Sequence, residues 1–259
     1  MHTLLKNKYI LDVLATIMFF TRIPINWAYF SEKPPDLTKA AWAFPIVGFL
    51  IGVLSGLVGD IFIYVGLPTF LSCTISIVIS VILTGAFHED GLADSSDGLG
   101  AGGTPVQVNK IIHDSRLGTY GVSSLVLGLI LRLGLMMTLV EKGYSLVSIL
   151  CVGFASGKVA IIFARNFFSN SSFAKVGSIV GEISSKKLII ALFIWLFPTI
   201  FIFSLDSILL GIFFMTLVTM VLGKKSQKAL GGLTGDILGA IAFLTELGFL
   251  LGIAILTSI

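Results

Sequence analysis

Long apolar runs separated by short polar stretches dominate this chain. A helix that crosses a membrane needs about 20 consecutive, mostly apolar residues. The runs are continuous and do not alternate as the strands of a membrane β-barrel would, so the pattern predicts helices. We expect an all-α fold, a polytopic integral membrane helical bundle in the lipid bilayer, forming one domain over residues 1–259. About seven spans are expected, at roughly 41–65, 68–88, 120–140, 145–164, 188–205, 207–223 and 237–257.

The segment 9–30 precedes the first expected span and has only a short uncharged stretch between its charges, so whether it spans or re-enters is open. Only about nine uncharged residues separate Asp12 from Arg22, and Pro24 would interrupt a helix. Non-spanning backbone at membrane depth is tolerated where protein or a polar cavity covers it. We therefore expect a short re-entrant or interfacial element here.

Composition supports a membrane protein without a separate soluble domain. Hydrophobic residues make up 56% of the chain and charged residues only 12%, about half of the charged fraction usual for soluble domains. This deficit extends along the whole chain. The formal net charge of +3 is too small to indicate a nucleic-acid partner.

The distribution of basic residues predicts the orientation in the membrane. With the seven expected spans, one set of connections carries eleven Lys and Arg residues and the other set carries only Lys142. Because the basic side of a membrane protein usually faces the cytoplasm, the polar stretch 88–119 is expected there as an acidic cytoplasmic loop, with the C-terminus outside. The eleven residues are Lys33, Lys39, Lys110, Arg116, Arg165, Lys175, Lys186, Lys187, Lys224, Lys225 and Lys228.

Three aspartates in this stretch suggest a metal site. Asp90, Asp94 and Asp97 are spaced i, i+4 and i+7, which would place them on one face of a helix. Their mutual repulsion would be relieved by a divalent cation. Mg²⁺ takes oxygen ligands and often links carboxylates to substrate phosphates. We predict a magnesium site here; the alternative is a solvated acidic loop.

Two further polar clusters are compatible with phosphate. In the run from Asp114 to Gly121, Arg116 follows Ser115, and its planar guanidinium can donate two hydrogen bonds to phosphate oxygens. Before the last expected span, glycines could let backbone N–H groups approach an anion at a helix start; an ordinary turn or helix cap is the alternative. This second cluster reads Gly231-Gly232-Leu233-Thr234-Gly235-Asp236.

Three charged residues fall inside apolar runs: Arg132, Lys158 and Glu246. Charged side chains facing lipid are costly, so we expect these three to face the bundle interior or a cavity. Pairing for structure and contact with substrate are both open readings.

Taken together, four motifs in this order resemble the cobalamin synthase family, the adenosylcobinamide-GDP ribazoletransferases. Thr21-Arg22-Ile23-Pro24 is similar to the family's Thr-Arg-x-Pro motif. The family's signatures His-x-Asp-Gly-x-Ala-Asp-x-x-Asp-Gly, Asp-Ser-Arg-x-Gly-x-x-Gly and Gly-Gly-x-Thr-Gly-Asp are similar to residues 88–98, 114–121 and 231–236. The variable place of the first signature is taken by Glu89.

The resemblance implies the last assembly stage of vitamin B12, in a multi-pass protein of the cell (inner) membrane. The substrates would be adenosylcobinamide-GDP and α-ribazole, or its 5′-phosphate. The products would be adenosylcobalamin, or its 5′-phosphate, and GMP, with Mg²⁺ required. Other membrane enzymes of corrinoid assembly are further partners to consider.

On this hypothesis, Mg²⁺ on the three aspartates grips the diphosphate while a ribazole hydroxyl attacks phosphorus and expels GMP. Such transfers depend mainly on positioning and charge neutralisation. The expected catalytic residues are Arg116 and, as alternative proton acceptors, His88 and Asp114. The expected substrate-binding residues are Arg22, Ser115, Lys158, Gly231, Gly232, Thr234 and Asp236.

Three other classes are weaker matches. CDP-alcohol phosphotransferases carry an Asp-Gly-x-x-Ala-Arg pattern, which the sequence after Asp90 does not continue. Membrane prenyltransferases usually carry two aspartate-rich motifs, and the second half of this chain has none. Transporters bind their substrates near the bilayer midplane, often between repeated halves; no repeat is visible, and the acidic cluster is expected at a boundary.

Overall fold

The computed structural model describes residues 7–174 and 181–256, and within them every regular element is a helix. The one β contact in these ranges is an isolated parallel bridge between Asn170 and Leu233. This confirms the all-α prediction. The helices are α2 (Lys8–Phe20), η1 (Trp27–Tyr29), α3 (Leu37–Ala40), η2 (Ala41–Ala43), α4 (Phe44–Tyr64), α5 (Thr69–Thr84), α6 (Phe87–Ala101), α7 (Pro105–Ile112), α8 (Thr119–Glu141), α9 (Leu146–Phe167), α10 (Ser185–Thr199), α11 (Leu205–Leu230) and α12 (Gly235–Leu256).

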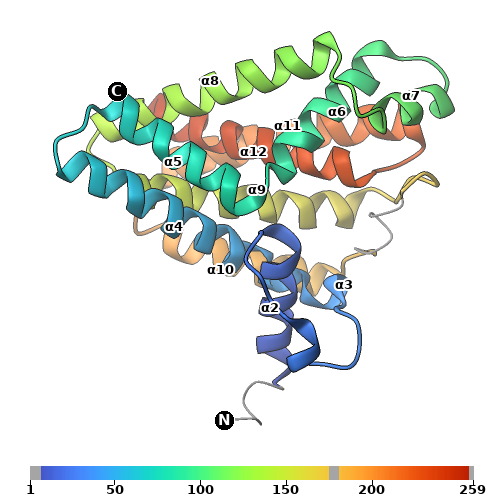
Figure 1. Cartoon of the computed structure of the whole chain (residues 1–259), viewed down its shortest axis with the longest axis horizontal. Coiled ribbons are helices and arrows are strands. Elements are labelled where there is room, and N and C mark those ends of the chain that lie inside the picture. The colour runs from blue at the N-terminus through green and yellow to red at the C-terminus, as the bar shows by residue number, and fades with distance from the viewer. Residues whose placement is uncertain (1–6, 175–180, 257–259) are drawn as a thin grey trace.

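The long helices lie side by side along the longest axis of the molecule (Figure 1). Helices α9 and α12 form the centre: 83% and 89% of their most apolar windows are buried, against 28% for α8 and α11. The outer faces of α8 and α11 expose apolar side chains, as expected of surfaces in contact with lipid. The chain is therefore a multi-pass membrane protein. These exposed side chains include Val122, Val126, Leu127, Ile130, Leu131, Leu209, Phe213, Leu217 and Val221.

Close contact between α4 and α9 depends on a row of glycines. Gly48, Gly52 and Gly56 recur every four residues on α4, and a Cβ atom on any of them would overlap the backbone of α9. Small residues at this spacing let membrane helices approach closely, so that dispersion forces act between the backbones. The row therefore fixes α4 against the central helix.

Fewer helices have spanning length than the seven predicted. Five are long and apolar enough, and the bent pair α5–α6 would make a sixth. The expected span 188–205 corresponds to α10, whose 15 residues end at Thr199, just after Pro198. At 1.5 Å per residue, α10 is about 22 Å long and too short for a hydrocarbon core of about 30 Å. The five helical segments are Leu37–Tyr64, Thr119–Glu141, Leu146–Phe167, Leu205–Leu230 and Gly235–Leu256.

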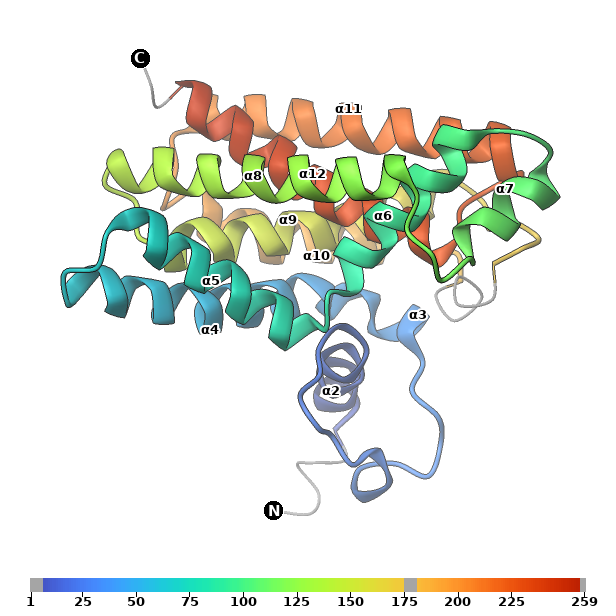
Figure 2. The same cartoon turned by 45° about the horizontal axis from the view of Figure 1, so that its top comes forward.

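The N-terminal segment does not have spanning length, as predicted. Helix α2 has 13 residues and runs crosswise to the bundle, so that Figure 2 shows it nearly end-on. The Trp42 indole N–H donates a hydrogen bond to the Asp12 carboxylate (2.8 Å). After α2 the chain returns to the bundle, where the Arg22 N–H bonds to the Leu83 carbonyl (2.7 Å).

The prediction that 88–119 is an acidic loop is wrong. Most of this stretch forms α6 and α7. A Cβ atom on Gly91 would overlap the backbone of α12, so α6 packs tightly on that helix despite its polar sequence. Helix α7 begins with a capping box between Thr104 and Gln107, which satisfies backbone donors at its first turn. Tertiary packing and local capping thus stabilise helices in this stretch, although its polar composition suggested a loop.

Candidate active site

The site begins at the break between α5 and α6. Gly85 (φ +65°) and Ala86 (φ +57°) both adopt left-handed backbone conformations, and the two helices meet at 87°. Within the described residues, Ala86 is the only residue other than glycine with positive φ, a conformation that costs free energy and often marks functional sites. The exposed Arg22 side chain packs on Gly85, where a Cβ atom would overlap its guanidinium. The Thr-Arg-x-Pro motif therefore lies at the start of α6.

The carboxylates predicted on one face of α6 form part of a larger acidic cluster. Asp90 is exposed and Asp94 is half-buried. Asp94 interacts electrostatically with Asp90, Asp97 and also Asp236 from the first turn of α12. The His113 imidazole, at the C-terminus of α7, acts on both Asp94 and Asp236 with the opposite sign. Three helices therefore bring four carboxylates and one imidazole together.

Asp97 connects α6 to the start of α8. Its two carboxylate oxygens accept hydrogen bonds from the backbone N–H groups of Gly118 (2.7 Å) and Gly121 (2.8 Å). A Cβ atom on either glycine would overlap this carboxylate. Asp97 thus acts as a distant cap for α8, where its charge also complements the helix dipole. The contact explains both glycines of the Asp-Ser-Arg-x-Gly-x-x-Gly motif, and the role of Asp97 as a metal ligand stays a prediction.

The acidic cluster is not a closed metal cage. Among residues 7–174 and 181–256, no three His, Cys, Asp or Glu side chains converge closely enough to hold a metal ion. The donors nevertheless fit Mg²⁺, which is usually bound by one or two carboxylates, several waters and substrate phosphates. Asp94 lies close to negative charges from α6 and α12. It is therefore the carboxylate whose charge a bound cation would stabilise most.

The Asp114 and Arg116 side chains form an exposed ion pair on the connection between α7 and α8. The guanidinium donates from Nε to Oδ1 (3.1 Å) and from Nη2 to Oδ2 (2.8 Å). Hydrogen bonds from Arg116 lower the pKa of Asp114 to about 2, and the same pairing raises the pKa of Arg116. Ser115 lies exposed between them. The pair places the Arg116 guanidinium at the rim of the site. The Asp114 carboxylate is a weak base in this arrangement, because its pKa is lowered.

The second candidate base, His88, lies at the opposite end of α6 from this ion pair. Nine residues separate it from Asp97, or about 13 Å along the helix. His88 is buried, and the Lys158 ammonium lies 3.2 Å from its Nδ1. The ammonium also lies 4.7 Å from the centre of the Phe20 ring. The structure therefore brings His88 and Lys158 together and separates both from Asp114.

A buried ion network lies beside this pair. Arg132 donates to Glu89 (2.8 Å) and to Glu246 (2.9 Å), and all three side chains are almost completely buried. Its guanidinium also lies 4.2 Å from the centre of the Phe243 ring. Lys158 also interacts electrostatically with both carboxylates. Arg132 and Glu246 are thus paired with each other in the interior, and contact of these charges with substrate stays a prediction.

The Gly-Gly-x-Thr-Gly-Asp motif forms the connection from α11 to α12. Gly231 ends α11 in a left-handed conformation (φ +72°), and a Cβ atom on Gly232 would overlap the backbone at Asn170. The Thr234 hydroxyl accepts a hydrogen bond from the Ile237 N–H (3.4 Å), as an N-cap does. The turn-and-cap alternative thus describes the first part of this motif.

Residues 169–171, which belong to none of the four motifs, are held against this connection. The Leu233 N–H donates to the Ser169 carbonyl (2.9 Å), and the Ser171 N–H donates to the Leu233 carbonyl (3.0 Å). The Ser171 hydroxyl bonds to the Leu230 carbonyl (2.6 Å). This clamp fixes the start of α12 and hence the position of Asp236 in the acidic cluster.

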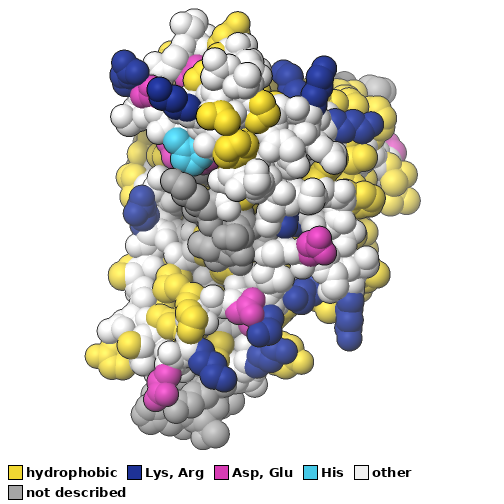
Figure 3. Space-filling model, turned by 90° about the vertical axis from the view of Figure 1, so that its right-hand side faces the viewer, with side chains coloured by type: hydrophobic (Ala, Val, Ile, Leu, Met, Phe, Trp, Pro, Cys, Tyr) yellow, Lys and Arg dark blue, Asp and Glu magenta, His cyan; other side chains and the backbone are white. Residues whose placement is uncertain are grey.

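Sequence reasoning missed two participants, Glu89 and His113. Glu89 lies about 100° around α6 from Asp90 and faces the interior. The two carboxylates are neighbours in the sequence, so their spacing could not show that one is buried and the other exposed. His113 directly precedes the Asp114 motif, and only the packing of α7 brings it near α12. Figure 3 views the end of the molecule that carries α6 and α7, where Lys and Arg side chains stand on several sides of the surface.

The comparisons with known proteins agree with the resemblance that these four motifs carry. The model of the family described as cobalamin-5-phosphate synthase matches residues 12–254. The chain belongs to this family. All four motifs that carried the resemblance thus lie on or next to α6 in a member of the cobalamin-5-phosphate synthase family.

Curated relatives match over nearly the whole chain. An adenosylcobinamide-GDP ribazoletransferase of Azorhizobium caulinodans is 29% identical over 256 residues, covering 96% of this chain and 97% of the relative. Proteins of the same name from Clostridium botulinum (strain Langeland) and Shewanella piezotolerans are 33% and 36% identical, each over 247 residues. These cover 93% and 90% of this chain and 96% and 90% of the relatives. No solved structure matches the chain.

Proposed function

We propose that this protein joins adenosylcobinamide-GDP to α-ribazole, or to α-ribazole 5′-phosphate. The products are adenosylcobalamin, or its 5′-phosphate, and GMP. Family membership supports the reaction class, and the curated relatives carry the corresponding name. The observation that carries the proposal to particular residues is the arrangement of the four family motifs around α6. Neither a CDP-alcohol phosphotransferase nor a prenyltransferase would require this combination.

In the proposed mechanism, Asp90, Asp94 and Asp236 would hold Mg²⁺ at the acidic cluster, where the diphosphate of the activated corrinoid would bind. The cation would neutralise charge on the phosphate oxygens, the main requirement of phosphoryl-type transfer. Asp97 keeps α6 in register with α8. The two exposed cations lie at opposite ends of α6, Arg22 at its start and Arg116 beyond its end, so each would bind a different phosphate group of the substrates.

The transfer exchanges one phosphorus–oxygen bond for another. The ribazole hydroxyl oxygen attacks the phosphorus that bears the cobinamide arm, the bond to GMP breaks, and the hydroxyl proton passes to a base of the protein. His88 and Asp114 are the two bases in the motifs. Because they lie at opposite ends of α6, substituting each in turn identifies which end receives the nucleophile.

We also propose that the end with α6 and α7 faces the cytoplasm, in the cell (inner) membrane. Cytoplasmic surfaces of membrane proteins carry an excess of Lys and Arg. Both substrates are polar and water-soluble, and the activated corrinoid is a diphosphate ester, so a site open to the cytoplasm would receive them directly. A partner enzyme of corrinoid assembly could deliver the corrinoid on the same side. Labelling of single cysteines at Lys110 and Lys142 with a membrane-impermeant reagent tests this orientation.

The deciding experiment is turnover by purified protein in liposomes with adenosylcobinamide-GDP, α-ribazole 5′-phosphate and Mg²⁺. We expect corrinoid product and GMP in equal amounts, and loss of both with EDTA. Asp94→Asn should reduce turnover at least 100-fold, consistent with the loss of electrostatic transition-state stabilisation. Asp206→Asn, at the first turn of α11, is the matched control and should be fully active. Normal turnover by Asp94→Asn would refute the metal assignment, and turnover only with CDP-alcohols or prenyl diphosphates would refute the substrate.

A further inference from the structure

A cavity lies on the face of α6 opposite to Asp90 and Asp94. Its volume is about 410 Å³, and α6, α8, α11 and α12 all contribute to its walls. On α6 it is lined by Leu92, Ser95 and Leu99. At 100° per residue, these side chains project away from Asp90 and Asp94. Helix α6 therefore separates this cavity from the acidic cluster.

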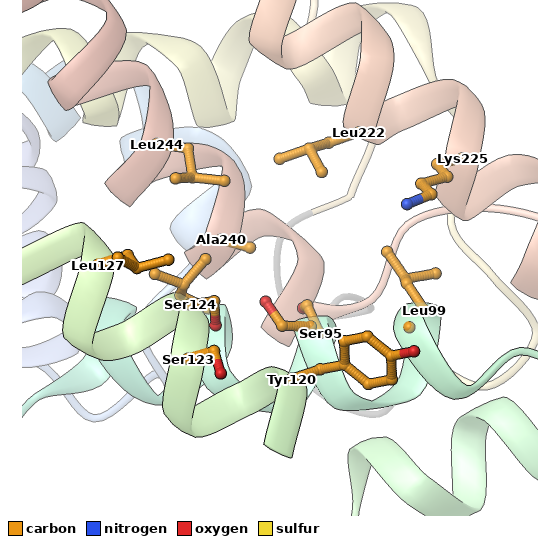
Figure 4. A pocket seen from close by; sticks show the side chains of 13 residues that line it. Ser95, Leu99, Tyr120, Ser123, Ser124, Leu127, Leu222, Lys225, Ala240 and Leu244 are labelled. Carbon is orange, nitrogen blue, oxygen red and sulfur yellow. The ribbon is translucent and has the colours of Figure 1, made fainter. Parts of the chain in front are cut away.

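An unsatisfied hydroxyl lies in the wall of this cavity. Ser95 is 2% exposed, and its Oγ has no hydrogen-bond partner within the described part of the chain. A buried hydroxyl without a partner is unfavourable. In Figure 4 the Ser95 oxygen points toward the open middle of the cavity. The oxygen is shielded from water in this rotamer, so a ligand that places a hydrogen-bond acceptor at this depth would satisfy it once the Ser95 side chain turns further toward the cavity.

The lining changes from polar to apolar along the cavity. The Lys225 ammonium and the Tyr120 hydroxyl lie at one end, whereas Leu127 and Leu244 lie at the other (Figure 4). Seven residues of α8 separate Tyr120 from Leu127, or about 10 Å along the helix. No carboxylate pairs with Lys225 among the described residues. The order of cation, hydroxyl and aliphatic side chains suits a phosphate, an ester group and an acyl chain in turn.

The cavity also lies between the two helices that are least enclosed by protein. The apolar faces of α8 and α11 are exposed on both sides of it, through residues such as Ile130 on α8 and Leu217 on α11. Lys225 lies in the last part of α11 and Tyr120 in the first turn of α8. The polar end is therefore near the helix termini, where phosphates of a bilayer leaflet lie, and the apolar end is deeper.

We propose that this cavity is a binding site for one anionic phospholipid. The lipid phosphate contacts Lys225 and Tyr120, an ester oxygen accepts a hydrogen bond from Ser95, and one acyl chain lies against Leu127 and Leu244. A lipid held here packs on α6 from behind. It would hold the helix that carries the acidic cluster without entering the acidic cluster.

Native mass spectrometry of the purified protein, titrated with phosphatidylglycerol or phosphatidylcholine, tests this proposal. We expect one molecule of phosphatidylglycerol to bind more tightly than the rest, with phosphatidylcholine weaker at the same site. Lys225→Gln should weaken phosphatidylglycerol about fivefold, the effect of one lysine near an anionic lipid. Lys224→Gln is the matched control, because Lys224 is a neighbouring lysine that does not line the cavity.

A second pair of variants tests the acyl-chain end without changing charge. Leu127→Trp should block the cavity and remove the tight lipid, whereas Leu131→Trp, one turn further along the exposed face of α8, should retain it. Equal effects of Lys225→Gln and Lys224→Gln would overturn the proposal, since any surface lysine would then suffice. Retention of the tight lipid by Leu127→Trp would overturn it as well. Displacement of the lipid by α-ribazole 5′-phosphate at equal concentration would assign the cavity to substrate instead.

Discussion

The buried ion network makes a quantitative prediction about stability. Arg132 bridges Glu89 and Glu246 at 2.8 and 2.9 Å, and its guanidinium is 1% exposed. In Arg132→Met, both carboxylates lose their hydrogen-bonded partner and face each other in an apolar interior. Breaking a buried ion pair by removing one partner typically costs about 3–5 kcal/mol. We expect a loss of this size in the free energy of unfolding.

The same network predicts that a second substitution recovers part of that loss. In Arg132→Met/Glu246→Gln, one positive and one negative charge have been removed together. Glu89 still lacks its hydrogen-bonded partner, and Lys158 is the remaining cation with which it interacts electrostatically. Replacing a complete buried ion pair by well-packed hydrophobic groups is often nearly neutral for stability, whereas a buried charge left without its partner is costly. The double variant should therefore be more stable than Arg132→Met and less stable than the parent protein.

Reversible unfolding in mixed micelles with increasing sodium dodecyl sulfate, followed by tryptophan fluorescence, measures these differences. Trp195 is fully buried against Phe249, which makes it a suitable probe. Arg116→Met removes an exposed cation and is the control, with little change expected, because exposed ion pairs contribute little to stability. A loss below 1 kcal/mol for Arg132→Met, or a double variant equal to the sum of its singles, would refute the coupling.

Two further predictions concern the motif Asp114–Gly121. Gly121→Ala should destabilise the protein by about 1–3 kcal/mol and lower turnover, since its Cβ would overlap the Asp97 carboxylate. Gly134→Ala, on the same helix, is the control. Its Cβ meets open space, so this variant should be more stable than the parent protein by about 0.5–1 kcal/mol. Chemical denaturation measures both, and equal effects would contradict the role of Asp97. Because Arg116 lowers the pKa of Asp114 to about 2, below the unfolded value of about 3.9, the stability contributed by this pair is fully present above about pH 5 and is lost as the pH falls toward 2. The stability difference between parent and Asp114→Asn should therefore be constant from pH 5 to 8 and shrink in acid; a change between pH 6 and 8 would contradict this assignment.

Hydropathy predicted the helical class and most of the bundle, because a long apolar segment in lipid satisfies its backbone hydrogen bonds by forming a helix. It overestimated the number of spans where apolar residues continue beyond a helix end. The run 188–205 includes the turn after Pro198, and the run 68–88 includes the left-handed pair Gly85–Ala86. Apolar composition measures compatibility with lipid, whereas helix ends are set by backbone conformation. The helical state of α6 was also not predictable from composition, since its contact with α12 depends on a residue far along the chain.

At the site, periodicity correctly placed Asp90 and Asp94 together, because both are on one helix. The approach of Asp236 and His113 comes from packing between α6, α7 and α12, which no local pattern contains. Lys158 and Arg132 were expected in the interior from the cost of charge in lipid. Pairing among the interior charges was one of two open interpretations, and Arg132 does bond across the bundle to Glu246, 114 positions away along the chain. Its second partner, Glu89, was not predicted.

The contacts around α6 bear on how many of its aspartates can bind a metal. Asp97 has both oxygens occupied by backbone donors of α8, and Glu89 is committed to Arg132. This leaves Asp90 and Asp94 on α6, with Asp236 opposite, without a hydrogen-bonded or ion-paired cation in the described residues. Mg²⁺ needs only one or two carboxylates when phosphates and waters complete its octahedron. We therefore propose that in this chain Asp97, with the glycines facing it, holds α6 against α8, and that Asp90 and Asp94 are the aspartates of α6 that bind the cation.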